Sequence, residues 1–367
     1  MAAVPAAPVH VSLPDGRGYP VHVDPLATAP RRLRDAGLPG RVLVVTDATV
    51  GPLWLAPLTD ALRADGRTVE TLAVPAGEAS KSLAVYSDVL DWALALGLDR
   101  GTPVLALGGG VVGDLAGFAA ATLLRGLPLV QIPTTTIAQV DSAIGGKTGL
   151  NHASGKNLVG AFHQPVFVLA DPATLATLPD RDFRSGLAEA VKHALISDAA
   201  LADRLRDDWD ALVGRRLDVV AALVRDAAAV KAAVVSADER EAGVRALLNF
   251  GHTFGHAIER EAGYGTLTHG EAVALGMRAA LHLSASLAAG AVAADLGPFA
   301  AADDLVARLS PPAPALDPDR LTAAMASDKK RTASGLRFVV LDAVGSARLA
   351  DGVPPAMVAA AWRHALR

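Results

Sequence analysis

The chain has 367 residues, which exceeds the usual size of one domain and predicts two domains with separate hydrophobic cores. Its hydrophobic residues, 51% of the total, are spread in periodic segments, so we expect neither a transmembrane helix nor a membrane partner. The formal net charge of -4 excludes a general basic surface for nucleic acid. Since the chain has no cysteine and does not begin with a signal-peptide pattern, a cytoplasmic enzyme is the simplest expectation.

The first half of the chain alternates between predicted strands and helices. The predicted elements are a hairpin at 9–23, strands at 41–46, 69–74, 103–107 and 128–132, and a helix at 52–65. This rhythm predicts an α/β domain with an open, mostly parallel sheet over residues 1–178. Because dinucleotides bind at the carboxyl ends of the strands in such sheets, we expect a dinucleotide-binding domain.

Polar or glycine-rich residues follow each of the four single strands. Asp47 follows the first, and a loop with Glu78 and Lys81 follows the second, where these side chains could face a ribose. Gly108 to Asp114 follows the third and begins a helix, so its backbone amides could approach a pyrophosphate. Thr134 to Thr136 follows the fourth, and at least one of these hydroxyls is expected to cap the next helix.

Lysine is rare in this chain, and its positions are therefore informative. Seven of the 34 basic residues are lysine, which leaves 34 − 7 = 27 arginines. Since arginine serves wherever a solvated positive charge is enough, lysine should remain where a compact ammonium group is needed. The segment 141–157 combines Lys147, Lys156 and Asn157 with glycines and could wrap a phosphorylated ligand. It lacks the first glycine of a P-loop, so no nucleotide triphosphate is expected.

Beyond residue 178 the pattern becomes helical, and we expect a metal-binding helical domain at 179–367 with one short hairpin at 336–349. His252 and His256 stand four apart, which places both imidazoles on one helix face, and His269 opens a second helix. These three nitrogen donors suggest a divalent metal, most simply zinc. On spacing alone, a packed or capping histidine pair is an equally good interpretation.

A further helix, expected from Arg184 to Ile196, contains Glu189 and Lys192 three residues apart. This spacing predicts an ordinary ion pair on one helix face.

In their order and spacing, these segments resemble the dehydroquinate synthase family of sugar phosphate cyclases. The segments that carry the resemblance are Gly108 to Asp114, Ile132 to Thr135, Val140 to Thr148, Gly155 to Asn157, Gly186 to Lys192 and Asn249 to His256. The resemblance implies a dehydroquinate synthase-like fold, with an α/β NAD-binding domain followed by an all-α metal- and substrate-binding domain. Thr49 departs from the asparagine that the family often has there, although its hydroxyl can still form a hydrogen bond.

The reaction that this resemblance implies is a lyase step of the shikimate pathway, which leads to the aromatic amino acids. 3-Deoxy-D-arabino-heptulosonate 7-phosphate would become 3-dehydroquinate and phosphate. The steps would be transient oxidation by NAD, β-elimination of phosphate, re-reduction and intramolecular aldol closure, with bound Zn²⁺ or Co²⁺. A homodimer is also implied.

The resemblance assigns roles to individual residues. Glu189, His252 and His269 match metal ligands, and His256 matches an acid–base group. Lys231 and Arg245 match a clamp for the substrate carboxylate. The residues that match the phosphate site are Lys147, Asn157, Lys192 and Asn249, with Lys329 or Lys330 closing it and Arg125 reaching it from a neighbouring subunit. The residues that match the NAD site are Asp47, Thr49, Glu78, Lys81, Gly109, Gly110, Val111, Asp114, Thr134, Thr135, Asp141, Ser142, Lys147 and Lys156.

Three alternatives remain open at this point. An aminodehydroquinate synthase, or another sugar phosphate cyclase of secondary metabolism, would share most of these residues, and the clamp cannot separate a substrate from its 4-amino analogue. A metal-dependent NAD polyol dehydrogenase would have no use for the clustered lysines and would release NADH. A non-enzymatic protein would show neither turnover nor bound metal.

Overall fold

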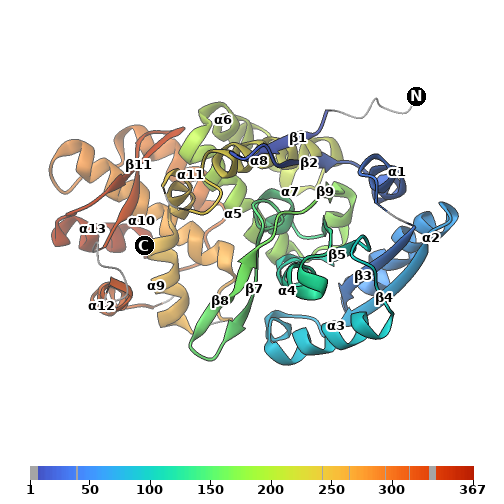
Figure 1. Cartoon of the computed structure of the whole chain (residues 1–367). Helices are drawn as coiled ribbons and strands as arrows, with labels where there is room; N and C mark the ends of the chain where they lie inside the picture. The colour runs from blue at the N-terminus through green and yellow to red at the C-terminus, as the bar shows by residue number, and fades with distance from the viewer. Residues whose placement is uncertain are drawn as a thin grey trace. The chain divides into compact units, whose positions relative to one another are not determined.

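The computed structural model describes residues 7–38, 40–241, 243–263, 265–293, 295–313, 315–329 and 336–367, with only the backbone at 326–329. The chain divides into two compact units, which are coloured along the sequence in Figure 1. The first unit contains Met1–Pro179 and Arg215–Arg240, and the second contains Asp180–Gly214 and Glu241–Arg367. The division at Pro179 falls where the sequence becomes helical, but the segment 215–240 belongs to the first unit.

The first unit is built on a seven-stranded sheet with the order β1-β2-β9-β6-β5-β3-β4. Its strands are β1 (Val9–Ser12), β2 (Gly18–Val23), β3 (Arg41–Asp47), β4 (Thr68–Val74), β5 (Val104–Gly108), β6 (Leu129–Pro133) and β9 (Phe167–Ala170). Every neighbouring pair is parallel except the hairpin β1–β2. The predicted open, mostly parallel sheet is therefore confirmed.

Strand β3 shows why this sheet is covered on both faces. Val42 and Val44 join an apolar core with Leu58 of the helix α2 (Ala56–Ala64). Leu43 and Val45 alternate to the other face and join a second core. The other helical elements of this unit are η1 (Leu26–Thr28), α1 (Ala29–Asp35), η2 (Gly51–Leu55), η3 (Glu78–Ser80), α3 (Leu83–Ala95), α4 (Gly110–Thr122), η4 (Leu123–Arg125), η5 (Ala138–Ser142), η6 (Pro172–Thr177) and α8 (Leu217–Ala237).

Helix α8 returns to the first unit because its apolar face packs on the sheet. Ala228, Ala232 and Val235 share a core with Val11 and Val21 of the hairpin β1–β2. Its helical periodicity shows that it has an apolar face, but not which partner covers that face. The sequence analysis assigns this segment to the helical domain at 179–367, whereas the structure groups residues 215–240 with the first unit.

The segment 141–157, expected from the sequence to wrap a ligand, contributes to a two-stranded antiparallel ribbon, which the sequence analysis did not predict. Its strands are β7 (Lys147–His152) and β8 (Gly155–Phe162). A methyl group on Gly160 would overlap the carbonyl oxygen of Thr148, and one on Gly117 of α4 would lie 2.5 Å from the Thr148 side chain. These glycines therefore permit close strand and helix packing, in addition to any role near a ligand.

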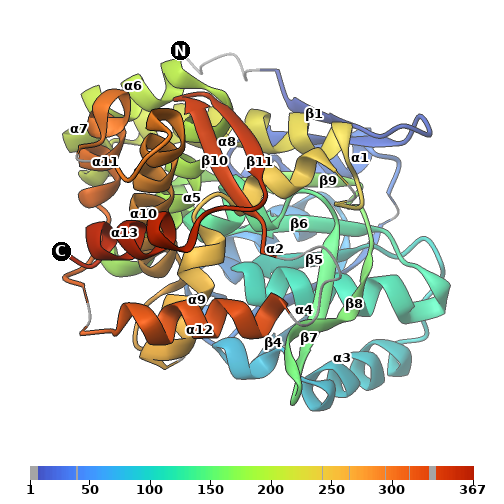
Figure 2. The ribbon, with the colours of Figure 1, turned by 90° about the vertical axis from the view of Figure 1, so that its left-hand side faces the viewer.

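The second unit is a group of helices around α10 (His269–Ala289), as Figure 2 shows. Its other elements are α5 (Asp180–Ser197), α6 (Ala199–Asp207), α7 (Trp209–Val213), η7 (Val244–Asn249), α9 (His252–Ala262), η8 (Gly297–Phe299), α11 (Ala300–Ala307), α12 (Pro318–Lys329), α13 (Pro355–Ala365) and the predicted hairpin β10 (Phe338–Ala343) and β11 (Ser346–Ala350). The unit is thus helical with one β-hairpin rather than all-α. Among the described helices, α10 alone is long and apolar enough to span a membrane, but 78% of its apolar window is buried inside the protein, as in a core helix.

Glycines bring α9 and α10 into backbone contact. A methyl group on Gly276 of α10 would overlap the carbonyl oxygen of Gly251 and lie 2.7 Å from the amide nitrogen of Gly255. Gly251 has a φ of 77°, in the left-handed region, and is the N-cap of α9. The first residue of α9, His252, is consequently held close to α10.

We expect Gly276→Ala to destabilise the protein because the added methyl group has no space at this helix contact. Overpacking of this kind typically costs about 1–3 kcal/mol in the free energy of unfolding, measurable by denaturant titration. Gly40→Ala is the control, since no atom lies within 4 Å of the added methyl group. Equal stability of the two variants would contradict this account of the α9–α10 contact.

Candidate active site

In the first unit, the glycine turn after β5 packs against residues that the sequence also selects. Gly109 is the N-cap of α4, and a methyl group there would lie 2.9 Å from the Thr135 side chain. One on Gly110 would lie 3.1 Å from Ser142 Oγ. Thr135 Oγ1 also accepts a hydrogen bond from Ala138 N at 3.3 Å, so the predicted capping by one of these threonines is confirmed. The turn presents backbone amides at a helix N-terminus, which suits a pyrophosphate.

Lys81 joins residues that the sequence assigns to different ligands. Its ammonium group donates to Asp114 Oδ2 at 2.6 Å and to Asn157 Oδ1 at 2.5 Å, and only 5% of Lys81 is exposed. Burial raises the pKa of Asp114, and the charge of Lys81 opposes that rise. In this structure Lys81 therefore holds two other candidate residues in place.

Asn151 completes this network, although the sequence interpretation does not select it. Its side chain donates to Glu78 Oε1 at 2.7 Å and accepts from the backbone N–H of Asn157 at 3.0 Å. Asn157 has a φ of 57°, a left-handed conformation that asparagine tolerates better than most residues. An asparagine in a glycine-rich segment gives no signal of such a bridge in the sequence.

Two further carboxylates of the NAD set are already engaged. Asp47 Oδ1 accepts from the backbone N–H groups of Thr49 and Val50, both at 2.8 Å, and so closes its own turn. Asp141 pairs with the buried ammonium group of Lys231, which α8 supplies. Four other predicted residues of this unit are exposed or partly exposed, namely Val111, Arg125, Lys147 and Lys156, whereas Thr134 is buried.

In the second unit, two imidazoles face one oxygen of the Glu189 carboxylate. Glu189 Oε1 lies 3.6 Å from His252 Nε2 and 3.4 Å from His269 Nε2, and the Glu189 side chain is fully buried. Tetrahedral ligands about 2.0–2.1 Å from a zinc ion lie about 3.3–3.4 Å from one another. The cluster therefore has the donor types and the spacing of a three-ligand metal site.

The other oxygen of this carboxylate, Oε2, pairs with the ammonium group of Lys192. The ion pair expected from the sequence is thus present, and it leaves Oε1 directed at the two imidazoles. Burial lowers the pKa of His252 to about 3, and the nearby charge of Lys192 adds to that effect. His252 is consequently neutral, as a metal ligand must be.

The position of His269 depends on the start of α10. Thr268 and Glu271 form a reciprocal capping box, and Arg181 of α5 donates to both Glu271 oxygens at 2.8 and 2.7 Å. Ser185 Oγ accepts from Gly270 N at 3.0 Å, and a methyl group on Gly270 would overlap the Ser185 backbone. These contacts fix the end of α10 against α5, the helix that carries Glu189.

A second group of possible ligands shares one of these residues. It consists of His256, Glu259 and His269, and its members are more exposed than those of the first group. Burial disfavours the protonated form of His269, but hydrogen bonds and charges from Glu189 and Glu259 outweigh it and raise the pKa to about 10. His269 therefore faces a carboxylate on each side.

Two more candidates lie on η7 of the same unit. Arg245 is buried, with 1% exposed, and Asn249 donates to Glu241 Oε1 at 3.4 Å. The sequence analysis did not select Glu241. Its left-handed backbone, with a φ of 61°, cannot be predicted from the residue type. The side chain of Lys329 and the whole of Lys330 lie outside the described residues.

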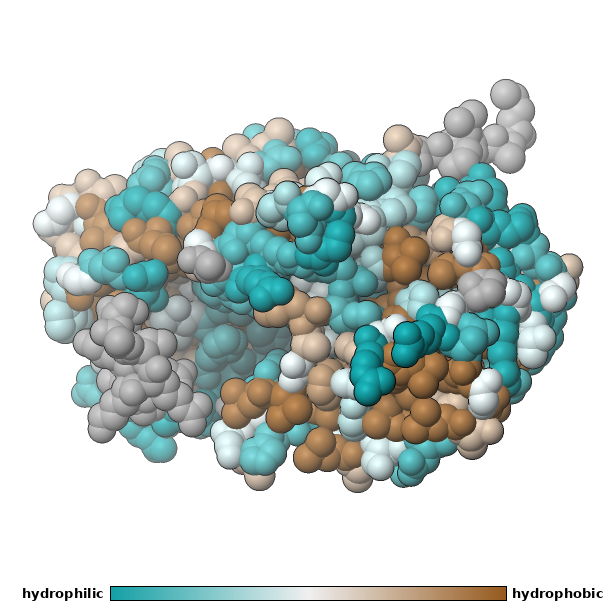
Figure 3. Space-filling view, viewed as in Figure 1, coloured by the Kyte–Doolittle hydropathy of each residue, from teal (hydrophilic) through white to brown (hydrophobic). Residues whose placement is uncertain are grey.

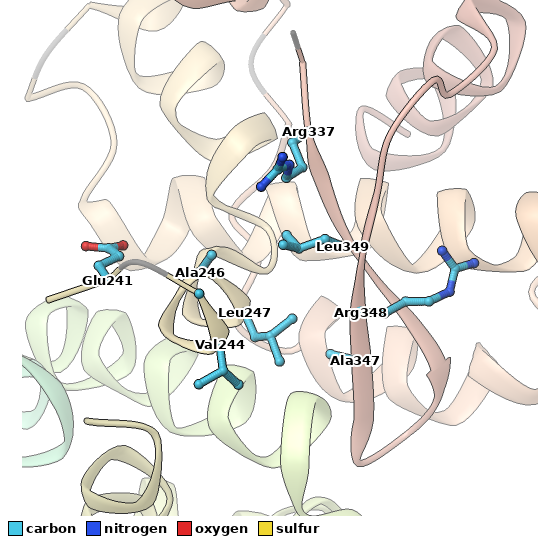
Figure 4. Close-up of a pocket in the computed structure, with 9 residues that line it drawn as sticks. Glu241, Val244, Ala246, Leu247, Arg337, Ala347, Arg348 and Leu349 are labelled. Atoms are coloured by element: carbon cyan, nitrogen blue, oxygen red, sulfur yellow. The ribbon is translucent and has the colours of Figure 1, made fainter. Parts of the chain in front are cut away.

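A pocket of about 340 Å³ lies between η7 and the hairpin β10–β11. Figure 4 shows the residues that line it. It is lined by Glu241, the small and apolar side chains near Val244, and the hairpin residues Arg337 and Arg348, of which Arg348 points away from η7. None of the predicted ligands or lysines lines it. This pocket is therefore distinct from the metal cluster.

Comparison with known proteins identifies the family. Sequence profiles described as 3-dehydroquinate synthase N-terminal and C-terminal match residues 71–185 and 186–331. The chain belongs to the 3-dehydroquinate synthase family. It is 52% identical to a 3-dehydroquinate synthase of Salinibacter ruber, over 98% of both chains. It is also 48% identical to one of Rhodospirillum rubrum, over 95% of this chain and 93% of the other.

Solved structures of cyclases share the fold. The chain is similar to 2-epi-5-epi-valiolone synthase of Streptomyces hygroscopicus, solved with NAD⁺ and Zn²⁺, with a TM-score of 0.83, 33% identity and coverage of 95% and 96%. It is similar to 2-deoxy-scyllo-inosose synthase, solved with carbaglucose-6-phosphate, NAD⁺ and Co²⁺, with a TM-score of 0.81, 26% identity and coverage of 97% and 99%. An iron-containing alcohol dehydrogenase, at 16% identity and a TM-score of 0.63, shares the fold alone.

The two overlapping ligand groups can be separated by metal analysis of purified variants. We expect His252→Ala and Glu189→Ala to lose bound zinc and His256→Ala to retain it, because only the first group contains a fully buried carboxylate. Metal content after dialysis is the measurement, with circular dichroism to verify folding. Loss of zinc from His256→Ala together with retention in Glu189→Ala would assign the metal to the second group.

Proposed function

We propose that this chain converts 3-deoxy-D-arabino-heptulosonate 7-phosphate to 3-dehydroquinate and phosphate, as a lyase of aromatic amino acid biosynthesis. The observation that carries the proposal is the cluster of Glu189, His252 and His269 in a chain so similar to 3-dehydroquinate synthases. When bound, NAD would accept and return a hydride, and Zn²⁺ or Co²⁺ would polarise the oxygen at which the ketone forms.

Residues of both units have parts in this proposal. The glycine turn at Gly109 and Gly110 would meet the pyrophosphate of NAD through backbone amides at the start of α4. Thr135 and Ser142 leave little room for a side chain at either glycine. Glu189, His252 and His269 would hold the metal. The remaining roles follow the family assignment, with His256 as acid–base group and the phosphate site formed by Lys147, Asn157, Lys192, Asn249, Arg125 and Lys329 or Lys330.

The choice of substrate rests on two buried cations. Lys231 is 6% exposed and Arg245 is 1% exposed, so each has lost most of its hydration. Lys231 also pairs with Asp141, so the clamp assignment follows the family resemblance and not a lack of partners. At a site with two largely desolvated cations, a carboxylate in the substrate would add charge-assisted interactions that an uncharged hydroxymethyl group cannot make. This favours the heptulosonate over sedoheptulose 7-phosphate, while the 4-amino analogue carries the same acid and stays an alternative.

A cytoplasmic homodimer is part of the same proposal. Arg125 is exposed and has a φ of 68°, next to Leu124 with a φ of 49°, so η4 holds it in an uncommon conformation. Leu158 and Phe162 of β8 are exposed apolar side chains of the same unit. Figure 3 also shows hydrophobic residues gathered in the lower part of its view. Exposed apolar surface of this kind would suit contact with a second copy of the chain.

We expect the purified protein to release phosphate from the heptulosonate phosphate with no net change in nicotinamide absorbance, because NAD ends the cycle as it began. Sedoheptulose 7-phosphate should not be turned over. Parallel phosphate and absorbance assays measure both results. Net NADH formation from a simple polyol would instead identify a dehydrogenase.

The matched variants for this test are Arg245→Ala and Arg348→Ala. Removing Arg245 should weaken binding of the carboxylate substrate by about 2–5 kcal/mol and narrow the preference between the two sugars. Arg348 is an exposed arginine paired with Asp342, so its removal should leave the preference unchanged. Comparable turnover of both sugars by the unmodified protein would overturn the clamp assignment.

A further inference from the structure

One carboxylate near the metal cluster has no role in the reaction proposed above. Glu259 lies on α9, seven residues after His252 and three after His256, so all three share one face of the helix. Glu259 Oε1 lies 3.4 Å from His269 Nδ1, and 14% of the Glu259 side chain is exposed. Its carboxylate is therefore largely withdrawn from water and directed at a predicted metal ligand.

The two nitrogens of His269 face different carboxylates. Nε2 lies 3.4 Å from Glu189 Oε1, and Nδ1 lies at the same distance from Glu259 Oε1. A neutral imidazole carries one proton, so only one ring nitrogen can bind a metal. If Nε2 binds the ion beside Glu189, then Nδ1 carries the proton and donates it to Glu259.

His252 follows the same pattern with a neutral acceptor. Its Nε2 faces Glu189 Oε1, and its Nδ1 lies 3.2 Å from the backbone carbonyl oxygen of Phe250. Both histidines thus direct Nε2 inward and have an acceptor at Nδ1. Only His269 has a charged acceptor, which makes an imidazole a more basic ligand than a carbonyl does.

We propose that Glu259 is a positioning residue that fixes the orientation and tautomer of His269, so that Nε2 is presented to the metal. This inference rests on the proposed metal site. Residues of this kind typically change metal affinity about 10- to 100-fold when they are removed. Glu259 itself would not contact the metal or the substrate.

The test measures zinc affinity by competition with a chromogenic chelator, using metal-free protein without NAD or substrate. We expect Glu259→Ala to bind Zn²⁺ about 10- to 100-fold more weakly than the unmodified protein. Glu259→Gln should recover part of that loss, because its amide oxygen still accepts from Nδ1 but has no charge. Thermal melting of the metal-free variants verifies that each is folded.

Glu261 provides a matched control on the same helix. The Glu261 side chain is 18% exposed, which is similar to the 14% of Glu259. Its carboxylate pairs with Arg320 at 3.1 Å and not with a histidine. Glu261→Ala and Glu261→Gln should therefore bind zinc with unchanged affinity. The absorption spectrum of bound Co²⁺ gives a second readout, which should change in the Glu259 variants and not in the Glu261 variants.

Three results would overturn the proposal. Unchanged zinc affinity in Glu259→Ala would remove the role, and an equal loss in Glu261→Ala would show a general effect on α9. Equal losses in Glu259→Gln and Glu259→Ala would make Glu259 a direct ligand, since an amide does not replace a carboxylate on zinc. Because no turnover is measured, these results are independent of whether the chain proves to be the proposed cyclase.

Discussion

The candidate metal site depends on close backbone contacts at two helix junctions. Gly276 allows α10 to touch the Gly251 turn that precedes His252. Gly270 allows the start of α10, and with it His269, to lie against Ser185 on α5. A side chain at either glycine would separate the helices by more than the tolerance of a metal site, in which ligand positions must hold to about 0.5 Å.

The buried charge of Glu189 gives this arrangement its chemistry. A carboxylate without solvent is costly unless cations or donors surround it. Lys192 meets one oxygen, and the other faces Nε2 of His252 and of His269, where a bound metal would supply further positive charge. Because Lys192 pairs with Oε2, it helps to direct Oε1 toward the two nitrogens. The ion pair is therefore compatible with the proposed role of Glu189 as a metal ligand.

The sequence predicts the parts of this molecule that follow from local periodicity. The parallel strands, the helix that carries His252 and His256, the helix that begins at His269 and the hairpin at 336–349 are all present. The placement of α8 was wrong and the ribbon β7–β8 was missed, because both depend on which distant surface covers an apolar or glycine-rich segment. Glu259, Asn151 and Glu241 were also missed, since their partners are set by tertiary contacts and by left-handed backbone near Asn157 and Glu241.

The central claim is that Glu189, His252 and His269 together hold the metal. X-ray absorption spectroscopy of the zinc-loaded protein tests it most directly, because the number of imidazole ligands can be counted from the outer-shell scattering. The account predicts two imidazole nitrogens and at least one oxygen at about 2.0–2.1 Å from zinc. The same first shell should persist in His256→Ala, because His256 belongs only to the second group. A first shell with three imidazoles in the unmodified protein, or loss of one imidazole in His256→Ala, would contradict the claim.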